Sequence, residues 1–161
     1  MRIGILTVSD LGAMGQRADT SGDAIQAWAN EKGHEVVVRS VVPDETDRIA
    51  GKLMRWADSG ELDVVLTTGG TGLTARDVTP EATAAVLDRT APGIAEALRS
   101  AAARHFPRAW LSRGVAGTRK RTLIVNLPGS TGGVQDGLAL LDGGGLLDHA
   151  VELVSGARTE H

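Results

Sequence analysis

The sequence predicts an α/β protein in which helices cover both faces of a mostly parallel sheet. Short apolar runs alternate along the chain with segments whose apolar residues recur at helical spacing. The apolar runs are nearly continuous, as in strands that are buried on both faces. This alternation is typical of right-handed βαβ units. Because 161 residues can bury a substantial core, we expect one domain over residues 1–161.

The first half of the chain contains three predicted strands and two predicted helices. Strands are predicted over residues 2–8, 35–42 and 63–68. After a polar loop, Ser21 is a good N-cap for a first helix, which ends at Gly33. A second amphipathic helix ends at Gly60. Trp28 and Trp56 lie at helical spacing with other apolar residues, so we expect both in the core.

The second half is less regular. Helices are predicted over residues 79–87, 94–104, 134–141 and 146–154, and a strand over residues 122–127. Thr79 as N-cap and Pro80 at the first helical position begin the first of these helices. Residues 106–121 fit either short strands or an irregular connection. Within them, Trp110 is either a core residue or part of a subunit interface.

The composition argues against several classes of protein. The formal net charge is −3, tyrosine is absent and phenylalanine occurs once, which argues against a nucleic-acid backbone or stacked bases as the main ligand. No apolar run approaches the ~20 residues of a membrane helix, and no cleavable leader precedes the first strand. Cysteine is absent, which suits a reducing compartment. We therefore expect a soluble, cytoplasmic protein.

Residues 67–80 have the composition of a phosphate site. They follow an apolar strand, contain three glycines between Gly69 and Gly72, place Arg76 beside Asp77 and then open a helix. Glycines let a backbone approach a ligand closely, and free N–H groups at a helix start attract anions. An acidic residue in the same loop can hold a metal that neutralises phosphate. The glycines match neither the dinucleotide fingerprint nor the P-loop.

Other polar loops are predicted at the same edge of the sheet, where the carboxyl ends of parallel strands bind ligands. They contribute Ser9, Asp10, Asp44 and residues 128–130. Aspartates beside glycine-rich loops suit phosphoryl or nucleotidyl transfer, in which carboxylates hold Mg²⁺ and backbone N–H groups hold phosphate oxygens. No G-x-S-x-G elbow of a hydrolase occurs. The histidines show no metal-ligand spacing: His34, His105, His149 and His161.

Each of these residues also has a purely structural explanation. Asp44 fits a turn or cap before its helix, and on the residues alone this explanation outweighs catalysis. Asp77 fits a favourable charge near a helix start, and Ser130 fits a helix N-cap. Glycine after a strand is more often a turn residue than part of a ligand cradle. Two aspartates at one predicted edge nevertheless favour a site.

A longer set of motifs runs through most of the chain. It comprises T-V-S-D at residues 7–10, S-G at 21–22, P-D at 43–44, T-T-G-G-T-G at 67–72, R-D-V-T-P-E-A at 76–82, P-G at 92–93, Glu96, Arg99, L-S-R at 111–113 and N-L-P-G-S at 126–130. In order and spacing this set resembles the molybdenum-cofactor biosynthesis proteins of the MogA/MoaB type, related to the molybdopterin-binding domains of plant and animal cofactor-synthesis proteins. The motifs are specific together, and none is specific alone.

The resemblance implies a molybdopterin-binding-domain fold, a three-layer α/β/α structure with a mostly parallel central sheet, assembled as a homotrimer. It implies a molybdopterin adenylyltransferase, which transfers AMP from Mg-ATP to the terminal phosphate of molybdopterin, releases pyrophosphate and works with other cofactor-biosynthesis proteins. The catalytic aspartates fall on Asp44 and Asp77, which would also hold Mg²⁺. The substrate- and nucleotide-binding positions fall on Ser9, Asp10, Thr68, Gly69, Gly70, Thr71, Gly72, Arg76, Pro128, Gly129 and Ser130, with Ser130 on the pterin side.

The chain departs from the family after residues 128–130. A proline and a lysine often follow there, whereas this chain has residues 131–132, Thr-Gly. A cationic phosphate contact is therefore missing or supplied elsewhere, with the basic residues 119–121 as candidates. Arg76 and Arg113 are further candidates for phosphate contacts.

Two other functions remain open on the sequence alone. The altered stretch after Ser130 allows a non-catalytic molybdopterin-binding or partner-docking protein of the same fold, because a fold does not fix a function. The generic architecture also allows a flavodoxin-like or other nucleotide-binding module unrelated to molybdenum.

Overall fold

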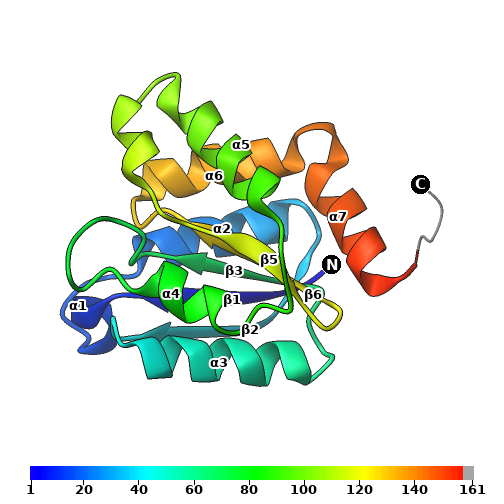
Figure 1. Ribbon diagram of the computed structural model, residues 1–161, viewed down its shortest axis with the longest axis horizontal. Coiled ribbons are helices and arrows are strands. Elements are labelled where there is room, and N and C mark those ends of the chain that lie inside the picture. The colour runs from blue at the N-terminus through cyan, green and yellow to red at the C-terminus, as the bar shows by residue number, and fades with distance from the viewer. Residues whose placement is uncertain (158–161) are drawn as a thin grey trace.

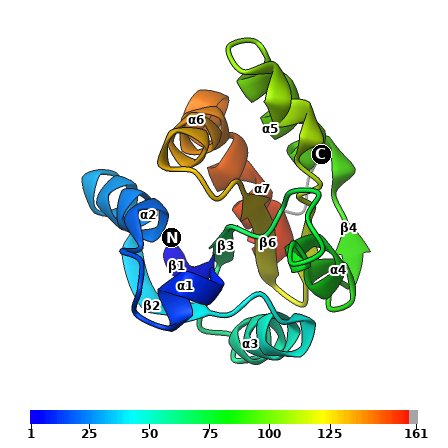
Figure 2. The ribbon, with the colours of Figure 1, turned by 90° about the vertical axis from the view of Figure 1, so that its left-hand side faces the viewer.

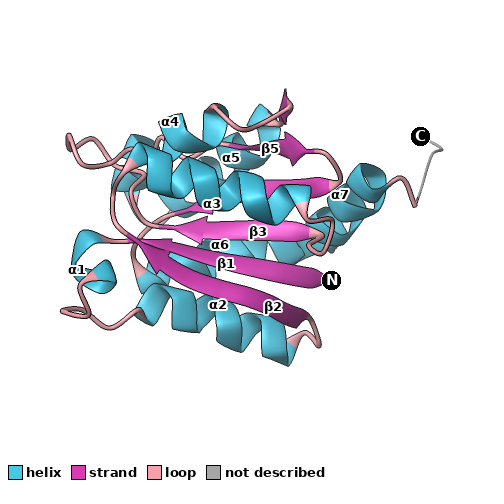
Figure 3. Cartoon of the chain, turned by 90° about the horizontal axis from the view of Figure 1, so that it is seen from below, coloured by secondary structure: helices cyan, strands magenta, loops and turns pink. Residues whose placement is uncertain are grey.

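The computed structural model describes residues 1–157, so His161 and the end of the predicted domain lie outside the described residues. Its centre is a six-stranded sheet in the order β2-β1-β3-β6-β5-β4 (Figures 1 and 3). The strands are β1 Arg2–Val8, β2 Glu35–Val42, β3 Val64–Thr68, β4 Arg89–Thr90, β5 Ala116–Arg119 and β6 Thr122–Leu127. β1 is parallel to β2 and β3, and β3 to β6, whereas β5 is antiparallel to both neighbours. The predicted mostly parallel sheet is confirmed.

Helices cover both faces of the sheet (Figure 2). They are α1 Asp10–Ala13, α2 Thr20–Glu31, α3 Thr46–Asp58, α4 Thr79–Ala84, α5 Pro92–Ala103, α6 Thr131–Asp142 and α7 Leu146–Ser155, with 3₁₀ helices η1 Pro107–Leu111 and η2 Gly143–Gly145. One core cluster joins α2, α6 and α7 to the sheet through Ile25, Leu138 and Val151, and α5 packs against it. A second cluster joins α3 and α4 to the other face through Leu53 and Ala82. The three-layer α/β/α prediction is therefore confirmed.

The continuous apolar runs of β1, β3 and β6 are buried on both sides, as predicted, whereas in β2 at the edge of the sheet only Val42 is buried. All residues of β3 are buried, with Val64 in the first cluster and Val65 in the second. Burying a valine or leucine contributes ~1.5–3 kcal/mol, which explains why both faces are covered by helices. Trp56 is buried in the second cluster and Trp28 packs against the first. Trp110 lies on η1 with 59% of its surface exposed, so it is not a core residue.

Two predicted helix N-caps, Ser21 and Thr79, are not the N-caps in the structure. Asp19, rather than Ser21, caps α2 and accepts a hydrogen bond from the Gly22 N–H over 2.9 Å. Thr79 is the first residue of α4 rather than its N-cap, since its hydroxyl donates to the carbonyl oxygen of Gly69 over 2.9 Å.

The chain between α4 and β6 also differs from the prediction. α4 ends at Ala84 rather than at Leu87, and Asp88 then pairs with β5 by donating its N–H to the Thr118 carbonyl oxygen over 2.8 Å. The ambiguous residues 106–121 form η1 and β5. The four residues of α1 and the two of β4 were not predicted, because such short elements show no period. No helix within residues 1–157 is long and apolar enough to cross a membrane.

Candidate functional site

The predicted loops converge at one edge of the sheet, which faces the viewer in Figure 2. Parallel pairing explains the convergence, because it turns the carboxyl ends of β1, β2, β3 and β6 in the same direction. Side chains that lie more than a hundred positions apart in the sequence therefore meet there. One example is the hydrogen bond between the hydroxyls of Thr131 and Thr20, over 3.0 Å.

Two pockets open at this edge. The apolar pocket, of about 610 Å³, lies between α5, η1 and the first turn of α6, and most of its lining surface is apolar, with contributions from side chains such as Leu98. The polar pocket, of about 650 Å³, lies beside β1 and the start of α2 and includes Asp19. Gly70, Gly129 and Ser130 line both pockets. We refer to these three residues as the shared wall.

The loop after β3 bends in a way that requires glycine. Gly69 and Gly70 have φ angles of +94° and +65°, and a Cβ on Gly69 would lie 2.2 Å from the carbonyl oxygen of Val8. The N–H groups of Gly70, Thr71 and Gly72 donate no hydrogen bond to any part of the chain that the structure describes. They are therefore available to an anionic ligand.

The start of α4 contributes less to anion binding than predicted. The N–H of Thr79 donates to the carbonyl oxygen of Gly70 over 3.1 Å, and Pro80 has no N–H. α4 is also only six residues long. The first two positions of the helix therefore offer no free donor, whereas the glycine loop does.

Asp44 and Asp10 exchange hydrogen bonds between the loops that follow β2 and β1. The Asp10 N–H donates to Asp44 Oδ2 and the Asp44 N–H donates to Asp10 Oδ1, each over 2.9 Å. Asp10 also forms an ion pair with Arg76, whose Nη2 lies 2.8 Å from Asp10 Oδ1. The N-cap residue of α3 is Glu45. Asp44 therefore does not cap that helix.

The two carboxylates lie in different electrostatic environments. The hydrogen bond from Arg76 holds the pKa of Asp10 below its ordinary value. Burial raises the pKa of Asp44, and the nearby charges of Asp10 and Asp77 add to the rise. Asp44 forms no ion pair with any described residue. Its carboxylate would therefore gain from a cation placed beside it.

Asp77 lies beyond the glycine loop and lines the apolar pocket. Its Oδ2 accepts hydrogen bonds from the N–H and the hydroxyl of Thr74, over 2.8 and 2.7 Å. A Cβ on Gly72 would lie 2.9 Å from that oxygen, so the glycine leaves room for the carboxylate. The loop thus holds the Asp77 carboxylate in one position. A residue that served only as a favourable charge near the start of α4 would not need such hydrogen bonds.

Asp44, Asp77 and Ser130 meet at one edge but not in one pocket. Of the two pockets, Asp44 lines the polar one, Asp77 the apolar one and Ser130 both. Gly70 lines both pockets and lies close to Asp44, since a Cβ on it would lie 3.1 Å from Asp44 Oδ1. Ser130 is the N-cap of α6 and accepts a hydrogen bond from the Gly133 N–H over 3.1 Å. The structural explanation for Ser130 is thus confirmed, and its place in both pockets adds to it.

The remaining predicted residues build the walls of the site. Ser9 caps α1 and accepts a hydrogen bond from a backbone N–H of that helix over 3.0 Å. The hydroxyl of Thr68 donates to the carbonyl oxygen of Pro128 over 2.7 Å. A Cβ on Gly129 would lie 3.2 Å from the Cα of Gly69. These contacts join the loop after β3 to the loop after β6.

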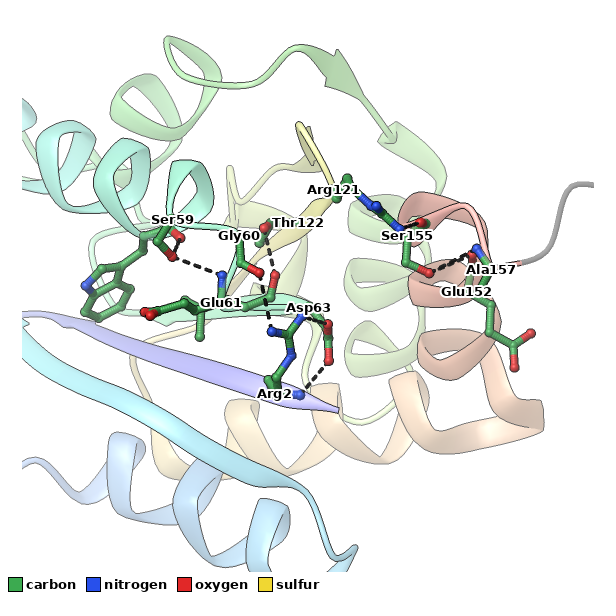
Figure 4. Close-up of polar contacts among 12 residues, drawn as sticks. Arg2, Ser59, Gly60, Glu61, Asp63, Arg121, Thr122, Glu152, Ser155 and Ala157 are labelled. Carbon is green, nitrogen blue, oxygen red and sulfur yellow. Dashed lines mark hydrogen bonds and ion pairs between the residues drawn. The ribbon is translucent and has the colours of Figure 1, made fainter.

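The basic residues 119–121 lie at the opposite edge of the sheet. Arg119 and Lys120 pair with Asp58, over 2.8 and 3.4 Å. Arg121 donates to the carbonyl oxygen of Ser155, as Figure 4 shows. These residues precede β6, whose other end borders the site. The prediction that they replace the missing lysine is therefore wrong.

Other arginines do line the pockets, although the sequence did not single them out. Arg17 lines the polar pocket and Arg108 the apolar one. Neither stands in a motif: Arg17 lies in the polar loop after β1, and Arg108 in the stretch that fitted no single element. Asp19 was also missed, and its position just before a helix was the available signal.

A divalent cation fits the site only if a substrate brings further ligands. Among residues 1–157, no group of three or more histidine, aspartate or glutamate side chains could hold a metal ion. Mg²⁺ is usually bound by one or two carboxylates, with substrate phosphates and water completing its shell. Asp44 and Asp77 suit this role, because the charge of Asp77 raises the pKa of Asp44 and a cation would relieve that repulsion.

Comparison with known proteins decides the family. Residues 4–142 match the family model described as "Probable molybdopterin binding domain". The chain belongs to this family. One relative of this molybdopterin-binding domain, the molybdopterin adenylyltransferase of Helicobacter pylori (strain ATCC 700392 / 26695), is 39% identical over 138 residues, which are 84% of this chain and 78% of that protein.

Further relatives extend the comparison. The molybdenum cofactor synthesis protein cinnamon of Drosophila melanogaster is 40% identical over 94% of this chain, which spans only 25% of the fly protein. The crystal structure of the molybdopterin biosynthesis enzyme MoaB from Thermus thermophilus is 50% identical, with a TM-score of 0.89 over 96% of each chain. These similarities confirm the predicted family and fold, and they reject a nucleotide-binding module unrelated to molybdenum.

Proposed function

We propose that this protein is a molybdopterin adenylyltransferase. The observation that carries the proposal is the shared wall, at which an apolar and a polar pocket meet with Asp77 in one and Asp44 in the other. Such a pair of pockets suits two substrates whose reacting groups meet at a common boundary. The name of the relative that is 39% identical supports the same activity.

In the proposed reaction, an oxygen of the terminal phosphate of molybdopterin attacks the α-phosphorus of ATP. A P–O bond forms between the pterin phosphate and the adenylyl group. The bond from the α-phosphorus to the oxygen that bridges to the β-phosphate breaks, and pyrophosphate leaves with that electron pair. The protein provides no nucleophile, so it acts by positioning the substrates and neutralising their charge.

The site residues divide this work. Asp44 and Asp77 would hold Mg²⁺, which when bound neutralises the triphosphate. The free N–H groups of residues 70–72 bind phosphate oxygens. Arg76, held by Asp10 beside Asp44, supplies a positive charge near the triphosphate. Ser9, Thr68, Pro128, Gly129 and Ser130 fix the shape of the two pockets.

We further propose that residues 1–161 form one domain that works in the cytoplasm as a homotrimer, with other cofactor-biosynthesis proteins as partners and without nucleic acid or membrane. The absence of cysteine and the net charge of −3 support the location and the lack of a nucleic-acid partner. Phe106, Trp110 and Leu111 are each more than half exposed, with 56%, 59% and 54% of their surface accessible. An apolar surface of this kind suits a subunit contact.

Incubation of the purified protein with molybdopterin, ATP and Mg²⁺ tests the proposed activity. We expect release of one pyrophosphate for each molecule of a product that contains both AMP and the pterin, measured by an enzyme-coupled assay and by mass spectrometry. Omission of any one component should abolish the product. Tight binding of molybdopterin without an ATP-dependent product would instead favour a non-catalytic pterin-binding or partner-docking protein.

A further inference from the structure

We propose that Arg113 is a positioning residue, which holds the loop of Asp77 in the shape that the reaction needs. The proposal rests on the proposed function, because it assumes that Asp77 takes part in adenylyl transfer. The sequence suggested that this arginine contacts a phosphate. In the structure its side chain instead contacts other residues of the protein.

Arg113 contacts both ends of the loop formed by residues 71–77. Its backbone N–H donates to the carbonyl oxygen of Thr71 over 2.8 Å. Its Nε donates to the carbonyl oxygen of Gly72 over 2.7 Å, and its Nη2 to the carbonyl oxygen of Asp77 over 2.6 Å. One residue therefore fixes the start of the loop relative to its end.

The guanidinium group is itself oriented by α4. Its Nη1 forms an ion pair with Glu81 in the first turn of that helix. The pair is partly exposed, at 33% for Arg113 and 55% for Glu81, so it contributes little free energy by itself. Because the guanidinium is planar, however, the pair turns the remaining N–H groups towards the loop carbonyls.

The segment that carries Arg113 is held in turn by Arg99 of α5. The Nη1 of Arg99 donates to the carbonyl oxygens of Ser112 and Gly114, over 3.3 and 2.8 Å. These are the residues on either side of Arg113. Since Arg99 lines the apolar pocket, a series of contacts runs from that pocket to the backbone of Asp77.

The loop has few other polar attachments to the rest of the protein. The hydrogen bonds between Asp77 and Thr74 lie within the loop and shape only its turn. Leu73 is 65% exposed. Arg76 does reach outside the loop, through an ion pair with Asp10 in which its side chain is 61% exposed. Arg113 makes the more buried attachment, and it makes it to the backbone.

The variants Arg113→Met and Arg113→Lys test the proposal by the split between kcat and KM. Methionine removes the side-chain donors but keeps the backbone contact, so we expect kcat to fall about 100-fold, as for a misplacement of ~1 Å, while both KM values change less than threefold. Lysine keeps the charge but cannot reach both carbonyl oxygens, so it should recover only part of the loss. An increased KM with unchanged kcat, restored by lysine, would identify a phosphate contact and overturn the proposal.

Arg119→Met is a matched control at the other edge of the sheet. Arg119 also combines a carboxylate pair, with Asp58, and a backbone carbonyl, that of Val86 over 2.9 Å. We expect this variant to lower the melting temperature about as much as Arg113→Met and to leave kcat unchanged. An equal loss of kcat in both variants would show that Arg113 acts through general stability alone, which contradicts the proposal.

Hydrogen–deuterium exchange separates this proposal from the proposed function. In Arg113→Met, the hydrogen-bonded amides of the loop, those of Thr74 and Asp77, should exchange at least about tenfold faster than in the wild type, and in Arg119→Met at the wild-type rate. If the wild-type protein forms no adenylylated product, the proposed function fails, and the exchange measurement still decides whether Arg113 holds the loop. Unchanged exchange in Arg113→Met would overturn the positioning role.

Discussion

The two edges of the sheet use the same kinds of side chain to different effect. At the edge where the strands begin, Asp63 accepts hydrogen bonds from the backbone and the guanidinium of Arg2, both over 2.7 Å (Figure 4). Asp58 pairs there with Arg119. At the edge where the strands end, Asp44 accepts a backbone N–H but pairs with no arginine that the structure describes. The first edge is closed by its own contacts, whereas the second can still accept a ligand.

The pKa values of these carboxylates show the same difference. The hydrogen bond from Arg119 lowers the pKa of Asp58. Burial acts to raise the pKa of Asp63, but the hydrogen bonds from Arg2 outweigh it and leave the pKa lowered. In Asp44, burial prevails and the pKa is raised. A carboxylate that pairs with a neighbouring arginine therefore has a structural role, whereas one without such a partner can still bind a cation.

The largest effect is expected for Asp44→Asn and Asp77→Asn. Each removes one charge that would face the metal and triphosphate, so kcat should fall about 100- to 1,000-fold while molybdopterin still binds. Because a raised pKa disfavours the ionised form in the folded protein, Asp44→Asn should not lower the melting temperature at pH 7. Pyrophosphate release, pterin titration and calorimetry provide the measurements. Variants that bind pterin and turn over as fast as the wild type would refute the assigned roles.

A smaller effect is expected in the pH dependence of kcat/KM. Asp44 must be ionised to bind a cation, and its pKa in the folded protein is raised, so activity should be lost as the pH falls through a value above 3.8, the ordinary value for aspartate. The charge of Arg76 opposes that rise. Arg76→Met should therefore move the acid limb to higher pH, whereas Arg119→Met should leave it in place. An unmoved limb would show that Asp44 does not control it.

The smallest effect is expected at the closed edge. Asp63→Asn removes a partly exposed ion pair, which should cost about 0.5–1 kcal/mol of the free energy of unfolding at pH 7 and leave kcat unchanged. Since the pKa of Asp63 is lowered by folding, this contribution is present above 3.8 and is lost as the pH falls through the lower, folded value. Urea unfolding at several pH values measures the difference, which should shrink in acid. A variant that also lost activity would contradict the separation of the two edges.

Sequence reasoning succeeded where local pattern determines structure. The buried strands were predicted from continuous apolar runs, and the parallel direction of β2, β3 and β6 then placed Asp44, Asp77 and Ser130 at one edge. Sequence reasoning failed where the hydrogen-bond partner of a side chain cannot be read from the residues next to it. Ser21 and Asp19 are both good N-caps, and the carbonyl that accepts the hydroxyl of Thr79 lies ten residues away. No local pattern distinguishes such alternatives.

The arginines show the same limit within the site. In the sequence, Arg113 was a candidate for a phosphate contact, and the basic residues 119–121 were candidates to replace the missing lysine. In the structure, Arg113 donates to the loop carbonyl oxygens and Arg119 pairs with Asp58. The arginines that line the pockets include Arg17 and Arg108, which the sequence did not single out. The division of the site into two pockets was also not predicted, because η1 and Phe106 border the apolar pocket and belong to the ambiguous stretch.

The shared wall has a consequence for the energetics of binding. Gly70, Gly129 and Ser130 face both pockets, so a ligand that orders them from one side changes the surface that the other ligand meets. We therefore expect the two substrates to be thermodynamically linked: molybdopterin should alter the affinity for the nucleotide by the same factor by which the nucleotide alters the affinity for molybdopterin. A boundary that both ligands touch would make the two half-sites one cooperative unit.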